Sequence, residues 1–150
     1  MRIAIGSDHA GFELKEALRE WLHDAGHEVI DVGTDTEASC DYPVFGAAVA
    51  RAVAAGDADR GVAVCGSGQG ICMAANKIPG VRAAVVRTAE DAELSRRHND
   101  ANVACFGGRV TAVAEAENAL GVFLSTDFEG GRHERRIDLL AELDAEGRDG

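Results

Sequence analysis

The sequence predicts an α/β fold, a three-layer αβα sandwich around a five-stranded parallel sheet, in a single domain. Three observations support this prediction. The chain has 150 residues, which is enough for one domain with a buried core. Short apolar runs rich in β-branched residues alternate with longer amphipathic stretches. No internal repeat or linker divides the chain. Such alternation places helices on both faces of a parallel, Rossmann-like sheet.

The predicted elements follow one another as strand–helix pairs. The strands are expected at residues 2–5, 28–32, 61–65, 81–86 and 102–107. The helices are expected at residues 11–25, 42–55, 70–76, 89–98, 112–124 and 132–146. The first helix has the clearest pattern, an apolar stripe that ends at Gly26 and consists of Phe12, Leu14, Leu18, Trp21 and Leu22. We expect the domain to span residues 1–143 and residues 144–150 to form a frayed tail.

Right-handed crossovers bring the loops that follow parallel strands to one edge of the sheet. Polar and glycine residues follow several of the predicted strands, in the segments 6–11, 33–34, 65–70, 87–88 and 107–109. The segment 97–100, at the end of the fourth helix, is expected on the same face. We therefore expect a ligand to bind at the carboxyl ends of the strands.

The charge of the chain indicates which classes of binding partner are favoured. The formal net charge is -11, which disfavours nucleic acid and anionic membranes. Basic residues still cluster at 96–98 and 132–136, which suits a small anionic ligand; the alternative is that both runs are solvated helix faces. No apolar run approaches the ~20 residues of a membrane span, and the N-terminus does not resemble a secretory signal. We expect a cytoplasmic protein.

The four cysteines suggest neither disulfides nor metal binding. Without a secretory signal they are expected to be reduced, and no CxxC pair occurs. His23 and His27 have helical spacing, but Gly26 interrupts the helix between them. We predict no metal site and no cofactor.

A glycine loop follows the third predicted strand. Gly66, Gly68 and Gly70 can turn backbone N–H groups inward to bind an anion, although a tight strand-to-helix turn is the simpler alternative. The loop matches neither a dinucleotide fingerprint nor a P-loop. Cys65 precedes it at a helix N-terminus, which favours the thiolate form and makes Cys65 a candidate base or nucleophile. Cys72 and Cys105 lie in apolar patterns and are expected in the core.

Two histidines are further candidates. His9 has Asp8 beside it and His98 has Asn99 beside it, each in a predicted loop or helix terminus. A neighbouring carboxylate can orient a histidine for proton transfer. A lone histidine is more often structural, so the pattern alone is compatible with either a catalytic or a structural role for His9 and His98.

Several motifs together resemble a known family, the type B ribose-5-phosphate isomerases, which are related to galactose-6-phosphate and allose-6-phosphate isomerases. The resemblance spans residues 1 to about 143. The matching segments, by their first residues, are IAIGSDHAGF from Ile3, DYP from Asp41, CGSGQGI from Cys65, AANK from Ala74, SRRHNDANV from Ser95 and GGRHERR from Gly130. One branch of the family carries a glutamate base at the position of Ile71, so Cys65 places this chain in the cysteine branch.

The resemblance implies a fold and an assembly. It implies the strand order 2-1-3-5-4 and a homodimer whose active sites are built from two chains, with a tetramer as the alternative assembly. It also implies roles in catalysis: Cys65 as the base, His98 as the acid/base that opens the furanose ring, and Ser67 and Asn99, with the backbone of Gly66, Gly68 and Gly70, as the groups that hold the enediolate.

Binding roles follow from the same resemblance. Asp8 and Tyr42 are expected to contact sugar hydroxyls or the ring oxygen. The phosphate is expected to be bound by His9, Arg109, Arg132 and Arg136. The implied reaction interconverts D-ribose 5-phosphate and D-ribulose 5-phosphate through an enediolate, in the pentose phosphate pathway, without metal or cofactor. This chemistry needs a base and oxyanion donors.

The sequence is compatible with several alternatives. Within the isomerase class, the substrate could be allose 6-phosphate, galactose 6-phosphate or a tetrose phosphate. A flavodoxin-like or receiver-type binding module has similar strand–helix alternation, but here the third strand ends in Cys65 where a receiver has aspartate. A thiol redox protein would need a resolving cysteine close to Cys65 in sequence, and there is none.

Overall fold

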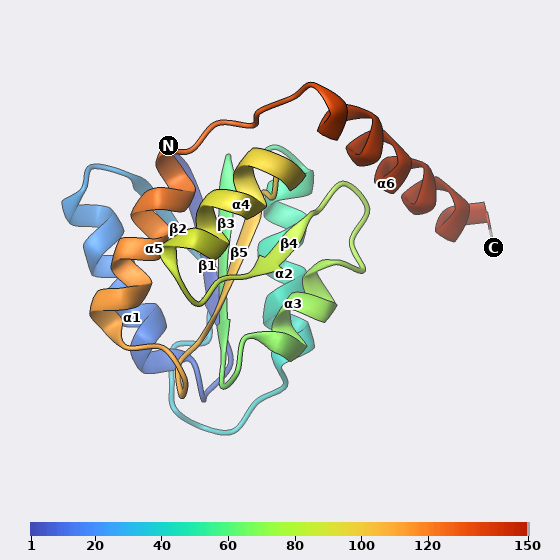
Figure 1. Ribbon diagram of the computed structural model, residues 1–150. Helices are drawn as coiled ribbons and strands as arrows, with labels where there is room; N and C mark the ends of the chain where they lie inside the picture. Colours follow the sequence, from blue (N-terminus) through green and yellow to red (C-terminus); the bar gives the residue numbers. More distant parts are fainter. Residues whose placement is uncertain (150) are drawn as a thin grey trace.

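The structure is a computed structural model that describes residues 1–149. Its centre is a parallel sheet with the order β2-β1-β3-β5-β4, as predicted (Figure 1). The strands are β1 (Arg2–Ser7), β2 (Glu28–Asp31), β3 (Arg60–Cys65), β4 (Ala83–Val85) and β5 (Val103–Gly107). The predicted fold class is therefore confirmed.

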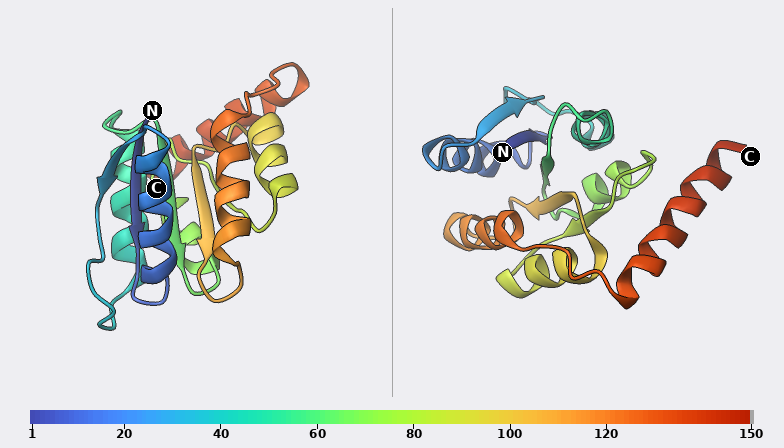
Figure 2. Two further views of the ribbon diagram at one scale, coloured as in Figure 1. Left: turned by 90° about the vertical axis from the view of Figure 1, so that its left-hand side faces the viewer. Right: turned by 90° about the horizontal axis from the view of Figure 1, so that it is seen from above.

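The helices form one layer on each face of the sheet. They are α1 (Phe12–Asp24), α2 (Tyr42–Ala54), α3 (Gln69–Ala75), α4 (Ala89–Asn99), α5 (Val113–Ser125) and α6 (Arg132–Asp149). Helices α1, α4 and α5 cover one face, and α2 and α3 cover the other (Figure 2). Every crossover between consecutive parallel strands thus contains a helix, which returns the chain to the amino ends of the strands.

Alternation along the strands divides the core into two parts. Val62 and Val64 of β3 face the layer of α1 and α5, whereas Ala63 and Cys65 face α2 and α3. Successive side chains of a strand point to opposite faces of a sheet. Cys65, the last residue of β3, therefore lies on the α2–α3 side, at the carboxyl end of the strand.

The boundaries differ from prediction mainly at β4 and α6. Residues 81–86 were expected in β4, but the strand begins at Ala83 because the Arg82 N–H donates to Asn102 Oδ1 (2.8 Å) instead of joining the sheet. Helix α6 continues to Asp149, so most of the expected tail is helical; residue 150 lies outside the described residues.

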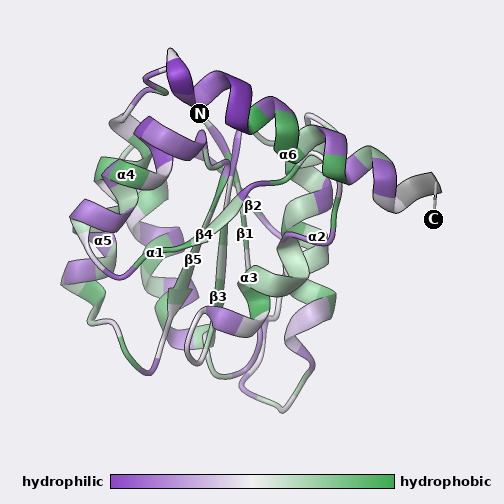
Figure 3. Ribbon diagram, turned by 45° about the vertical axis from the view of Figure 1, so that its right-hand side comes forward, coloured by the Kyte–Doolittle hydropathy of each residue, from purple (hydrophilic) through white to green (hydrophobic). Residues whose placement is uncertain are grey.

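Helix α6 extends away from the rest of the domain (Figures 1 and 3). It packs against α4, and Asp144 accepts a hydrogen bond from the Gly80 N–H (2.9 Å). Leu139, Leu140 and Leu143 of α6 are exposed. Among the described residues, no helix combines the length and the apolar character that a membrane crossing requires.

Two helix glycines test how tightly the layers pack. A Cβ at Gly46 of α2 would lie 2.9 Å from both Cγ1 and the carbonyl oxygen of Ile71, whereas a Cβ at Gly121 of α5 would lie 3.5 Å from the Trp21 ring. Gly46→Ala should therefore lower the free energy of unfolding by about 1–3 kcal/mol. Gly121→Ala should raise it by about 0.5–1 kcal/mol, because alanine is the better helix former. Urea unfolding measures both changes in the free energy of unfolding. Equal changes in the two variants would contradict this account of the α2–α3 contact.

Candidate active site

A pocket opens at the carboxyl ends of β1, β3 and β5, with a volume of about 400 Å³. Its walls come from the loops after these strands and from the start of α2. The lining residues are Asp8, His9, Ala10, Tyr42, Cys65, Gly66, Ser67, Gly70, Arg109 and Val110. We call this the strand-end pocket. It brings together most of the residues that the sequence nominates, from segments far apart in the chain.

Cys65 lies at the base of the glycine loop. Its side chain is buried, and its Sγ accepts a hydrogen bond from the Gly68 N–H (3.2 Å). Gly68 has a positive φ of 83°, which lets the loop turn its N–H back toward the sulfur before α3 begins. The Cys65 sulfur therefore lies beside the Gly68 N–H, just before the N-terminus of α3.

The loop after β5 holds the glycine loop in place. The Gly108 N–H donates to the Cys65 carbonyl (2.8 Å), and the Arg109 N–H donates to the Gly66 carbonyl (3.0 Å). A Cβ at Gly107 would lie 2.6 Å from the backbone of Ser67, so only glycine permits this approach. The Ser67 hydroxyl in turn accepts the Gln69 N–H (3.2 Å). These contacts fix the backbone around the thiol.

Asp8 and His9 occupy the opposite wall. The buried Asp8 carboxylate accepts the Gly11 N–H (3.0 Å), which fixes the turn into α1. His9 Nδ1 lies 3.2 Å from the Cys40 N–H, a donor, so Nδ1 is the acceptor. In a neutral ring the proton is then on Nε2. His9 therefore has a hydrogen-bond donor free to meet an anionic ligand.

Two glycines make room for large polar side chains. A Cβ at Gly70 would lie 2.7 Å from the Tyr42 ring, and one at Gly66 would lie 3.4 Å from the Arg109 guanidinium. Tyr42 and Arg109 can thus lie flat against the glycine loop. The glycines serve the packing of these side chains as well as the turn itself.

His98 and Asn99 lie elsewhere. They end α4, which starts at the carboxyl end of β4 and returns the chain to the opposite edge of the sheet. The expectation that they share a face with the strand-end pocket is therefore wrong within one chain. Asn99 instead lines a second, largely apolar cavity of about 450 Å³ beneath Leu140 and Leu143 of α6. Arg132 and Arg136, at the start of α6, are exposed and do not line the strand-end pocket.

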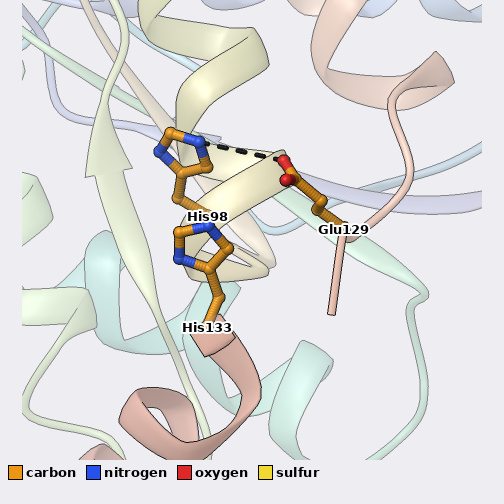
Figure 4. A group of neighbouring side chains, drawn as sticks. All are labelled: His98, Glu129 and His133. Carbon is orange, nitrogen blue, oxygen red and sulfur yellow. Dashed lines mark ion pairs between the residues drawn. The ribbon is translucent and has the colours of Figure 1, made fainter. Parts of the chain in front are cut away.

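The surroundings of His98 include two residues that the sequence analysis missed. The rings of His98 and His133 stack with centroids 4.4 Å apart, and Glu129 Oε2 lies 3.9 Å from His98 Nε2 (Figure 4). Arg97 pairs with the same Glu129 oxygen at 3.2 Å. Burial lowers the pKa of His133, and the nearby His98 and Arg132 lower it further. The one available signal was the location of His133 inside the basic run 132–136.

The family model for Ribose/Galactose Isomerase matches residues 3–140. The chain belongs to this family. Ribose-5-phosphate isomerase B of Escherichia coli (strain K12) is 43% identical over 143 residues, which cover 95% of this chain and 96% of that protein.

Solved structures of the ribose/galactose isomerase family agree with the fold. Ribose-5-phosphate isomerase B of Clostridium thermocellum superposes with a TM-score of 0.96 and 46% identity, covering 97% of this chain and 99% of that one. The enzyme of Mycoplasma genitalium, solved with bound ribulose-5-phosphate, has a TM-score of 0.92 and 42% identity, covering 97% of each chain. This family fold is the one that the sequence analysis expected.

Alkylation tests the accessibility of the thiols. Cys65 lines the pocket, whereas Cys105 is fully buried, and a hydrogen bond with Cys72, together with burial, raises the pKa of the Cys105 thiol. We expect iodoacetamide to label Cys65 in the native protein and to label Cys105 only after unfolding. Mass spectrometry of the digested protein measures both. Inorganic phosphate in the pocket should slow labelling of Cys65 but not of Cys40. Native labelling of Cys105 as fast as that of Cys65 would contradict the assigned burial.

Proposed function

We propose that this protein interconverts D-ribose 5-phosphate and D-ribulose 5-phosphate, an aldose–ketose isomerisation of the pentose phosphate pathway. Membership of the isomerase family and the ribulose-5-phosphate complex of a relative support this substrate. The observation that carries the chemistry is the Cys65 sulfur, which accepts the Gly68 N–H inside a polar pocket. The Gly68 N–H stabilises a thiolate at Cys65, which suits this side chain to act as the base.

The proposed reaction is a proton transfer between neighbouring carbons. The Cys65 thiolate removes the proton from the carbon next to the aldehyde of the open-chain sugar. The electrons of that C–H bond form the enediolate, whose oxygen is held by Ser67 and the loop N–H groups. The hydroxyl proton on the oxygen of that carbon moves to the former aldehyde oxygen, and the same thiol returns the carbon-bound proton to the former aldehyde carbon, which gives the ketose. The substrate and product are isomers, so no net oxidation occurs.

Substrate binding is assigned to the walls of the pocket. Asp8 and Tyr42 contact the sugar hydroxyls or ring oxygen. The Nε2–H of His9 and the Arg109 guanidinium hold the phosphate, since charged donors suit a dianion. Binding energy from the phosphate, remote from the reacting carbons, then positions the carbon next to Cys65.

The remaining residues suggest a homodimer. His98, Asn99, Arg132 and Arg136, which we call the α4–α6 cluster, lie away from the strand-end pocket of their own chain. We assign them to the pocket of a partner copy: His98 opens the furanose ring, Asn99 helps to hold the enediolate, and the two arginines complete the phosphate site. A two-fold axis would make two such sites per dimer. The exposed leucines of α6 support an interface there.

The substrate class is tested by direct comparison. Ribose 5-phosphate should give the highest kcat/KM when it is assayed beside allose 6-phosphate, galactose 6-phosphate and tetrose phosphates. The family also contains galactose isomerases, so a hexose phosphate is the second candidate. A higher kcat/KM for a six-carbon phosphate would change the assignment of the substrate but not of the reaction.

The base is tested by Cys65→Ala. In this variant kcat should be about 10³-fold lower, because a general base contributes a rate acceleration of about 10²–10⁴-fold. The substitution should also stop deuterium exchange from solvent into the substrate, while KM and the melting temperature change little. Cys40→Ala is the matched control, since Cys40 donates its backbone N–H to His9 and alanine keeps this hydrogen bond. Turnover near the wild-type value in Cys65→Ala would reject the assignment and direct attention to Asp8.

The shared site is tested at low substrate concentration by mixing two variants, one that lacks the base and one whose phosphate site is weakened. Cys65→Ala and Arg136→Ala subunits, denatured together and refolded, should regain about a quarter of the wild-type activity. Half of the dimers are then mixed, and one of the two sites in each contains both intact residues. If activity does not rise above that of the separate variants, Cys65 and Arg136 serve one chain's own site or none.

A further inference from the structure

His98, Glu129 and His133 form a compact set of metal-ligand donors. One nitrogen of each ring and one carboxylate oxygen all lie within 4.8 Å of one another, and no other such group occurs among the described residues. Figure 4 shows the two rings stacked and the carboxylate beside the His98 ring. The three residues come from α4, the loop before α6, and α6 itself. Sequence spacing could not reveal this set, because the fold brings its members together.

His133 adds a second, independent observation. Its side chain is nearly buried, with 7% of the residue exposed, and its Nε2 has no hydrogen-bond partner. Leaving a buried polar atom without a partner is energetically unfavourable. A cation bound beside the ring would give this nitrogen a partner. Two imidazoles and a carboxylate are also the donor set of several zinc sites.

The geometry requires only small side-chain movements. Donors around a tetrahedral Zn²⁺ are about 3.4 Å apart, given bonds of about 2.1 Å. His98 Nε2 and Glu129 Oε2 are already 3.9 Å apart, and their side chains are 36% and 44% exposed, so both can move. Each nitrogen lone pair lies in the plane of its ring. His98 must therefore rotate out of the stack, while the buried His133 stays in place.

The surrounding charge selects the kind of ion. Arg97 pairs with Glu129 at 3.2 Å, and Arg132 is adjacent to His133, so the site does not attract cations by charge. Hard ions such as Mg²⁺ and Ca²⁺ prefer oxygen ligands and would not bind. Zn²⁺, Cu²⁺ and Ni²⁺ favour imidazole ligands, so these ions are the ones expected to compete with Arg97 for Glu129.

We propose that His98, Glu129 and His133 bind a divalent transition-metal ion such as Zn²⁺, and that this ion inhibits the enzyme by coordinating His98. The inhibitory part rests on the proposed function, in which His98 opens the sugar ring. The binding of the ion does not rest on the proposed function. The ion and the ring-opening step compete for the same imidazole nitrogen.

Calorimetric titration of Zn²⁺ into the untagged, metal-free protein tests the binding part. We expect one ion per chain, with affinity at least about tenfold weaker in His133→Asn and in Glu129→Gln. Glu129 is exposed, so its variant keeps the fold even if His133→Asn does not. The control His23→Asn changes an exposed histidine and should bind like the wild type. Cys65→Ala should also bind normally. Affinity that survives both ligand variants, or is lost in Cys65→Ala, overturns the site.

Inhibition is measured separately. Zn²⁺ should lower the isomerisation rate of the wild type, a chelator should restore it, and Mg²⁺ should have no effect. The zinc concentration for half inhibition should rise in Glu129→Gln, with each protein compared with its own metal-free rate. Zinc that binds at the site without slowing the reaction overturns the inhibitory part. A protein that binds zinc as expected but does not isomerise any sugar phosphate would instead contradict the proposed function.

Discussion

The strand-end pocket depends on the contact between Gly107 and the backbone of Ser67. Two backbone hydrogen bonds reinforce it, from Gly108 to Cys65 and from Arg109 to Gly66. Because the glycine loop is held through backbone atoms, its shape does not depend on mobile side chains. The Gly68 N–H can then point at the Cys65 sulfur. Catalysis of proton transfer requires such preorganisation, since donors that must reorient during the reaction stabilise its charge less.

The parallel sheet separates the polar residues into two groups. The residues that follow strands line the strand-end pocket, whereas the residues that end α4 or begin α6 lie away from it. This separation limits what one chain can do. The second group is locally basic in a protein of net charge -11, and local positive charge favours the approach of an anionic ligand.

Much of this architecture could be predicted from the sequence. Strand alternation and the topology of parallel sheets place the loops at 6–11, 65–70 and 107–109 together, and the pocket contains all three. His98 was misplaced because the prediction treated the end of a helix like the end of a strand. Glu129 and His133 were missed because their relation to His98 exists only after α6 packs on α4. The local sequence pattern carries no information about contacts between segments that are distant in the chain.

Helix α6 gives the molecule two levels of local stability. The sheet and its covering helices bury both parts of the core, whereas α6 contributes no residue to either part and leaves Leu139, Leu140 and Leu143 exposed. The free energy needed to unfold a segment locally increases with the number of apolar contacts that the segment buries. In an isolated chain, the amide hydrogens in the middle of α6 would exchange with solvent far sooner than those of β3. Their exchange rate therefore reports directly on whether another surface covers the helix.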